Sequence, residues 1–212
     1  MAVELVSFVT VWSFIGLNVL SPGPNVLNTI TISMGSGRAA GLAAAAGVGL
    51  GIVIWCLGMS LGVAMLFALF PVAQSALRLV GAGLLIWFAS RYLRSAWRGF
   101  HRQPAALSGV GGLSRSAAFL RSLMVIALNP KALTTWLFVL TIFPIARAGA
   151  ADVAVLCAGT VIVAAGIHTG YALVFSTRRA ARAYLKAAPF INAAVGVFFL
   201  VVATELALSV PG

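Results

Sequence analysis

The chain has 212 residues, of which 62% are hydrophobic and 8% are charged, and its mean hydropathy is +1.09. A soluble domain would carry about 25% charged residues, so this composition excludes a water-soluble globular protein and predicts an integral membrane protein with one compact domain over residues 1–212. The net charge of +11 does not indicate a nucleic-acid partner, because the basic residues lie in short stretches between apolar runs, as in cytoplasmic loops.

Six apolar runs predict six transmembrane helices, which makes the expected fold class all-α and polytopic. They cover residues 3–34, 40–69, 72–90, 117–146, 151–175 and 188–209. The first and fourth runs are too long for one straight helix through a hydrocarbon core about 30 Å thick, and proline interrupts each near its middle. We therefore expect helices one and four to be broken at the membrane midplane. If either broken run re-entered instead of crossing, the count would fall to five or four.

The basic residues predict the orientation of these spans. One group lies in a long polar segment between the third and fourth runs, a loop over about residues 91–116, and another follows the fifth run. Together with Arg38, eleven basic residues fall on one side, and only Arg78 and Arg147 fall on the other. By the positive-inside rule the larger group faces the cytoplasm, so both termini lie outside.

The two cysteines carry no recognisable motif. Cys56 and Cys157 each lie in an apolar run, without C-x-x-C spacing or a nearby His/Cys cluster. We expect two inert, buried thiols, and we expect neither a metal nor another cofactor.

The two halves resemble one another at a constant offset, which pairs Pro22 with Pro130. We infer an internal repeat, with repeat 1 at about 3–96 and repeat 2 at about 117–209. Because each repeat holds an odd number of spans, the repeats must be inverted, an architecture that yields alternating access around a site near the midplane. The offset also pairs glycines that share a helix face, which predicts close packing and an interior position for spans two and five: Gly51, Gly58 and Gly62 with Gly159, Gly166 and Gly170.

The two breaks hold the residues for which we predict a function. They read L-S-P-G-P-N-V-L over residues 20–27 and L-N-P-K-A over residues 128–132. Pro24 suits the first turn of a half-helix, and Asn129 is a good N-cap for one that begins at Pro130. Exposed helix N-termini attract a carboxylate and free carbonyls at the preceding helix end suit an ammonium group, so a zwitterion fits both. The alternative is that the prolines only kink packed helices.

Two ionisable side chains are predicted within the membrane. No Asp or Glu lies at the depth of Lys131, so we expect this lysine to face an aqueous cavity and receive a carboxylate. The alternatives are a deprotonated lysine, or a side chain that reaches an interface. His168 can titrate in the physiological range and is a candidate proton carrier, the alternative being a neutral histidine bonded to a neighbouring helix.

Several motifs together resemble the lysine exporter (LysE/RhtB) family over nearly the whole chain. These are S-P-G-P-N at 21–25, S-G-R-A-A-G-L at 36–42, N-P-K-A at 129–132 and Phe-Pro at 143–144. The resemblance implies a proton-driven exporter of amino acids or related small metabolites in the bacterial inner membrane. With the breaks, it gives the predicted substrate-binding residues: Ser21, Pro22, Gly23, Pro24, Asn25, Asn129, Pro130 and Lys131.

One position departs from that family. Ile52 follows Gly51 where many members carry an acidic or small polar residue, and the repeat offset places Thr160 opposite it. The candidate residues for proton coupling are therefore His168 and Lys131.

These observations predict a secondary active exporter, an antiporter that exchanges a small amino-acid-like substrate for protons, and not an enzyme. The alternatives are a transporter of another metabolite, an intramembrane enzyme or a channel. An enzyme would need a nucleophile with a base, paired acids or a metal cluster, and a channel would need a filter-like loop or a charged ring. The sequence does not identify the solute, and a homo-oligomer is left open.

Overall fold

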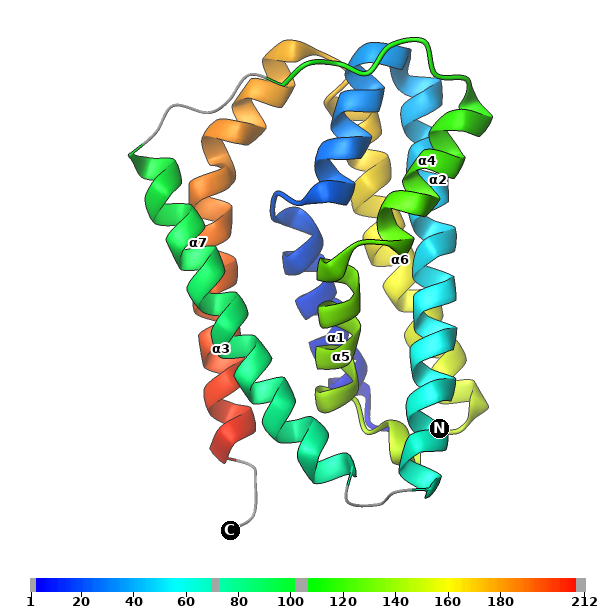
Figure 1. The fold of residues 1–212 in the computed structure, drawn as a ribbon, viewed down its shortest axis with the longest axis vertical. Helices are drawn as coiled ribbons and strands as arrows, with labels where there is room; N and C mark the ends of the chain where they lie inside the picture. The colour runs from blue at the N-terminus through cyan, green and yellow to red at the C-terminus, as the bar shows by residue number, and fades with distance from the viewer. Residues whose placement is uncertain (1–2, 70–72, 102–106, 209–212) are drawn as a thin grey trace.

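The structure is a computed structural model that describes residues 3–69, 73–101 and 107–208. At positions 63–69, 73–81 and 205–208 the description covers only the backbone of these residues. Over these residues it contains helices and loops and no strand (Figure 1), so the all-α prediction is confirmed. In chain order the helices are α1 (Leu5–Leu20), α2 (Pro24–Leu69), α3 (Ala73–Phe100), α4 (Arg115–Ala127), α5 (Pro130–Ile142), the 3-10 turn η1 (Ile145–Arg147), α6 (Ala150–Val174) and α7 (Arg178–Leu208).

The chain runs back and forth along the long axis of the bundle (Figure 1). α1 reaches the middle of the bundle, and after a break the first part of α2 continues to the far end, where Gly37, with φ 84°, turns the chain back. α4 and α5 form a second broken passage, bent by 57°. It runs opposite to the first, as an inverted repeat requires, and the start of α1 lies at the same end of the bundle as the end of α7.

Within the described residues, length and hydropathy identify three stretches of helix that can cross a membrane, and the bent α4–α5 pair provides a fourth. The three are Pro24–Gly62, which includes the turn at Gly37, Ala150–Val174 and Arg178–Thr204. α1 is apolar, but its 16 residues fall short of the roughly 20 that one crossing needs. The chain is a polytopic membrane protein, whereas six spans in two inverted repeats remain a prediction.

Two helices extend further at their basic ends than the apolar runs predicted. α3 continues to Phe100 and α7 begins at Arg178, so a part of each of the two segments expected as loops is helical. Arginine and lysine are good helix formers, and a helix does not have to end where lipid ends. Within the expected loop at 91–116, the described non-helical residues are 101 and 107–114. Arg78, expected near the outer face, lies outside the described side chains.

The glycines pack only partly as predicted. A Cβ on Gly47 would collide with the backbone of Phe119, and one on Gly51 would collide with Ile126, so α2 lies directly against α4. Four others face open space, so the prediction of close packing there was wrong: Gly58, Gly62, Gly166 and Gly170. α6 is not an interior helix either, since only 28% of its most apolar window is buried.

Cys56 and Cys157 form a disulfide, so the prediction of two free thiols was wrong. The partners are 101 residues apart in sequence, and the packing of α2 on α6 brings their Cα atoms to 5.8 Å. Cys157 lies about two turns from the start of α6, in the half of the bundle that holds the start of α1 (Figure 1). The bond joins helices of the two predicted repeats.

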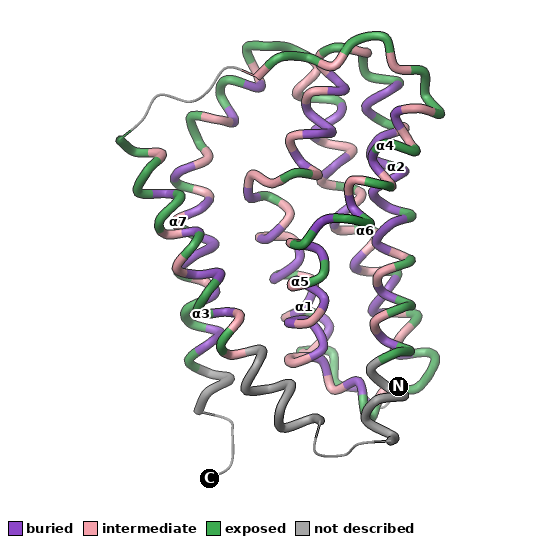
Figure 2. The backbone as a smooth tube through the Cα atoms, viewed as in Figure 1, coloured by how far each residue is buried: buried purple, intermediate pink, exposed green. Residues whose placement is uncertain are grey.

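Aromatic side chains fill the same half of the bundle. Buried residues follow the inner faces of the helices (Figure 2). Phe14 of α1 is central to this core, with its ring centroid 4.4 Å from that of Phe138 and 4.9 Å from that of Phe199. All three side chains are fully buried, so the bundle is densely packed between the breaks and the start of α1.

Candidate functional site

The two breaks meet in the middle of the bundle. α2 begins at Pro24 and α5 begins at Pro130, and Asn129 Oδ1 caps α5 by accepting from the backbone N–H of Lys131 at 2.9 Å. These starts agree with the predicted ones, because proline at the first helical position and asparagine at the N-cap are local signals. A Cβ placed on Gly23 would lie 3.2 Å from Lys131 Nζ. The loop of the first break is therefore in contact with the lysine of the second.

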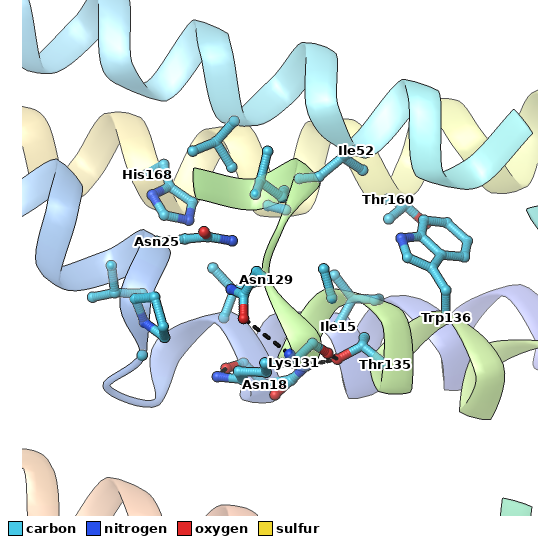
Figure 3. Close-up of a pocket in the computed structure, with 18 residues that line it drawn as sticks. Ile15, Asn18, Asn25, Ile52, Asn129, Lys131, Thr135, Trp136, Thr160 and His168 are labelled. Atoms are coloured by element: carbon cyan, nitrogen blue, oxygen red, sulfur yellow. Dashed lines mark hydrogen bonds between the residues drawn. The ribbon is translucent and has the colours of Figure 1, made fainter. Parts of the chain in front are cut away.

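A pocket of about 70 Å³ lies between the breaks (Figure 3), which is room for several water molecules. Side chains of α1, α2, α4, α5 and α6 line it. Ser21 contacts Lys131 but does not line the pocket, and neither do Pro22 and Pro130. The other predicted site residues line it: Gly23, Pro24, Asn25, Asn129, Lys131 and His168.

The ammonium group of Lys131 binds the carbonyl end of α1. Nζ donates to Asn18 O at 2.9 Å and to Ser21 Oγ at 2.8 Å. The carbonyl of Leu20 is also occupied, by the hydroxyls of Tyr171 at 3.1 Å and Tyr184 at 3.0 Å. These two carbonyls are therefore bonded within the protein and are not free for a substrate ammonium, contrary to the prediction for this helix end. An ammonium group has three N–H donors, so one donor of Lys131 is not used by these two bonds.

A closed chain of hydrogen bonds holds Lys131 in place. Ser21 Oγ accepts from Lys131 and donates to the Tyr92 hydroxyl at 2.9 Å, which donates to Asn18 Oδ1 at 2.9 Å. Asn18 Nδ2 then donates to Thr135 Oγ1 at 2.7 Å, and Thr135 donates to the backbone carbonyl of Lys131 at 2.5 Å. Ser21 Oγ also lies 2.8 Å from Asn18 O, so its one proton is shared between that carbonyl and the Tyr92 hydroxyl, whereas Tyr92 and Thr135 each donate once and accept once.

Three residues of this hydrogen-bond network were not predicted from the sequence, namely Asn18, Tyr92 and Thr135. Asn18 and Thr135 are buried polar residues inside apolar runs. Polar side chains are costly in hydrocarbon unless they find partners, so an asparagine within a span is a signal that such a network exists.

The two half-helix starts differ in the donors that they offer. At α5, Asn129 accepts from both Lys131 N and Ala132 N, so the predicted N-cap is present and these two N–H groups are already bonded. At α2, proline supplies no N–H and the first backbone bond runs from Leu27 N to Gly23 O at 2.9 Å. The backbone N–H groups of Asn25 and Val26 have no acceptor among the described residues. The start of α2, where the helix dipole is positive, therefore offers more unbonded N–H donors than the start of α5.

Two acceptor atoms lie toward one end of the pocket. His168 Nδ1 is 2.9 Å from Thr29 Oγ1, which also bonds the carbonyl of Asn25 at 3.0 Å. Both contacts are satisfied when the hydroxyl donates to that carbonyl and Nδ1 carries the ring proton, which leaves Nε2 as an acceptor. Asn25 Oδ1 is buried and has no partner in the described part of the chain.

The other end of the pocket is largely apolar. Thr160 and Trp136 lie there in Figure 3, away from Asn25 and His168, and Ile52 also lines the pocket. None of the lining residues is acidic, so Lys131 is the one fixed charge among them.

Comparison with known proteins places the chain in a family. The model of the LysE type translocators matches residues 17–210. A homoserine/homoserine lactone efflux protein of Salmonella typhimurium is 31% identical over 192 residues, which cover 89% of each chain. No solved structure matches the chain significantly.

Two further relatives match over a shorter region. A leucine efflux protein of an Enterobacter species is 31% identical over 115 residues, and an uncharacterised membrane protein of Pseudomonas aeruginosa is 30% identical over 115 residues. Each match covers 54% of this chain and 53% of the relative, about half the length of both. Because the family model covers nearly the whole chain, and the fold is that of a polytopic membrane protein, this protein belongs to the LysE type translocator family.

Proposed function

We propose that the protein exports amino acids or closely related small zwitterionic metabolites across the bacterial inner membrane, as a proton-coupled antiporter. The observation that carries the proposal is the pocket at the two breaks, where a lysine held by hydrogen bonds is the one fixed charge among the lining residues. The efflux proteins of Salmonella and Enterobacter are named for homoserine and leucine, which are neutral amino acids, and this supports the same substrate class here.

In the proposed binding mode the substrate carboxylate lies between Lys131 and the start of α2. The remaining N–H of Lys131 and the backbone N–H groups of Asn25 and Val26 are the donors for it. Asn25 Oδ1 and His168 Nε2 are acceptors for the ammonium group. The carboxylate and ammonium of an amino acid share one carbon atom, so donors and acceptors on one wall of a small pocket suit them.

Alternating access requires barriers on both sides of this pocket. On one side the barrier is the aromatic core around Phe14. On the other side it is the pair of Tyr171 and Tyr184, whose hydroxyls both bind the carbonyl of Leu20. We propose that rocking of the two repeats opens these barriers in turn.

Two independent features support an orientation with the start of α1 in the periplasm. The basic ends of α3 and α7 both lie toward the opposite end of the bundle (Figure 1), which favours the cytoplasm for that end. The Cys56–Cys157 bond lies in the half that holds the start of α1. Disulfides persist in the periplasm and are rare in the cytosol, so this half suits the periplasmic side.

Counterflow in proteoliposomes tests the proposed substrate class. We expect a neutral amino acid to exchange about tenfold faster or more than lysine, because a second ammonium would lie unpaired beside the charge of Lys131. Failure of every neutral amino acid to exchange, with the protein correctly inserted, would contradict the proposal. Chemical conversion of the solute would indicate an enzyme, and a leak that does not saturate would indicate a channel.

Proton coupling is proposed to run through His168. His168→Asn keeps a side-chain N–H donor for Thr29 but removes the titratable ring. We expect this variant to retain counterflow and to lose uphill efflux driven by an imposed pH gradient. His101→Asn is the matched control, since His101 is exposed and bonds the carbonyl of Trp97 in the last turn of the adjoining α3. Unchanged gradient-driven efflux in His168→Asn would leave Lys131 as the proposed coupling residue.

A further inference from the structure

The pocket wall holds a hydroxyl group that the fold does not use. Thr160 is 1% exposed, and its Oγ1 has no hydrogen-bond partner within the described residues. Threonine in a helix commonly bonds the carbonyl three or four residues earlier. Several threonines of this protein do so: Thr10, Thr29, Thr31, Thr134, Thr135, Thr141 and Thr204.

Thr160 is an exception to this pattern. The carbonyl four residues earlier, that of Leu156, accepts instead from Trp12 Nε1 at 3.4 Å. A buried hydroxyl without a partner destabilises a protein, and one that lines a pocket can find its partner on a ligand.

The surroundings of Thr160 limit what that ligand group can be. Ile52 and Trp136 line the same pocket, which has no Asp, Glu or Arg side chain in its lining and holds His168 at its other end. A charged substrate side chain would lie unpaired there, whereas a hydroxyl could bond Thr160 while its methylene groups contact the apolar wall. In Figure 3, Thr160 lies at the opposite end of the pocket from Asn25 and His168, so a substrate whose ammonium group is bound by those two residues would extend its side chain toward Thr160.

We infer that Thr160 hydrogen-bonds a hydroxyl group on the substrate side chain, so that the protein selects short, neutral, hydroxyl-bearing amino acids over apolar ones of the same shape. This inference rests on the proposed function. A site built to bond a hydroxyl discriminates against the analogue that lacks it, because the hydrogen-bonding group of the site is then left unpaired.

Homoserine and norvaline are the probes that isolate this contact, since they differ by a terminal hydroxyl in place of a methyl group. Thr160→Val makes the corresponding change on the protein, and Thr160→Ser keeps the hydroxyl. In counterflow we expect the wild type to favour homoserine in kcat/KM by about tenfold or more. Thr160→Val should bring the ratio near one, chiefly by slowing homoserine, and Thr160→Ser should keep the preference.

Three outcomes would overturn the inference while leaving the proposed function intact. They are equal exchange of both probes by the wild type, exchange of neither probe while leucine exchanges, and an unchanged ratio in Thr160→Val. If Thr160→Val is inactive towards both probes, a comparison of Thr160→Ala with Thr160→Ser also tests the hydroxyl. Equal homoserine-to-norvaline ratios of kcat/KM in those two variants would also overturn the inference. Absence of exchange for every neutral amino acid would overturn the proposed function and this inference together.

Discussion

Lys131→Met should slow substrate exchange by about 30-fold or more, while the protein still folds and inserts. Methionine keeps the length and the apolar stem of the side chain and removes the charge that the substrate carboxylate meets in the proposed mode. Loss of one partner of a buried, hydrogen-bonded charge pair costs roughly 2–5 kcal/mol, which is sufficient for this effect. Folding should survive because the bonds among Asn18, Tyr92 and Thr135 do not involve the ammonium group.

Counterflow with purified variants and their thermal melting in detergent provide the measurement. Arg94→Met is the matched control, because Arg94 is exposed and bonds Ser90 on its own helix. We expect it to exchange at the wild-type rate. Wild-type exchange by Lys131→Met would rule out the anion site at the breaks.

Gly47→Ala should destabilise the protein strongly, while Gly58→Ala on the same helix should not. The added Cβ at Gly47 would collide with the carbonyl oxygen of Phe119 and lie 3.3 Å from Leu123 N. These are backbone atoms of α4 that cannot rotate away, so the two helices must separate, at a cost of about 1–3 kcal/mol or more. At Gly58 the new methyl group meets open space, and alanine favours a helix over glycine by about 1 kcal/mol.

Melting temperature in detergent and yield of folded protein measure this difference. Gly47→Ala should melt well below the wild type, and Gly58→Ala should melt at or above it. Equal melting of the two variants would mean that α2 and α4 do not approach as closely at Gly47 as the structure has them.

The local features of the site could be predicted from the sequence, because each depends on a few neighbouring residues. Proline fixes the starts of α2 and α5, and the side chain of Asn129 reaches the next helix N–H without help from other helices. Hydropathy alone indicated a polytopic membrane protein. The helical extension of α3 to Phe100 was missed because an apolar run marks lipid contact, not the length of a helix.

The contacts between helices could not be predicted in this way. Asn18, Tyr92 and Lys131 lie on three helices, and their bonds depend on how those helices are rotated against one another. The same is true of Cys56 and Cys157, whose pairing depends on the contact between α2 and α6. The two breaks also interact with each other: the first break binds an ammonium group of the protein itself, that of Lys131 in the second break. This contact depends on tertiary structure and has no local signal in the sequence.

The Cys56–Cys157 bond limits how the two halves can move. It joins α2 to α6 at one covalent point, so these helices cannot slide past one another or part at that level. The relative motion of α2 and α6 is therefore a rotation about this bond. The bond lies in the half of the bundle that holds the start of α1, so the turn of α2 at Gly37 and the end of α6 at Val174, both at the opposite end of the bundle, would move furthest.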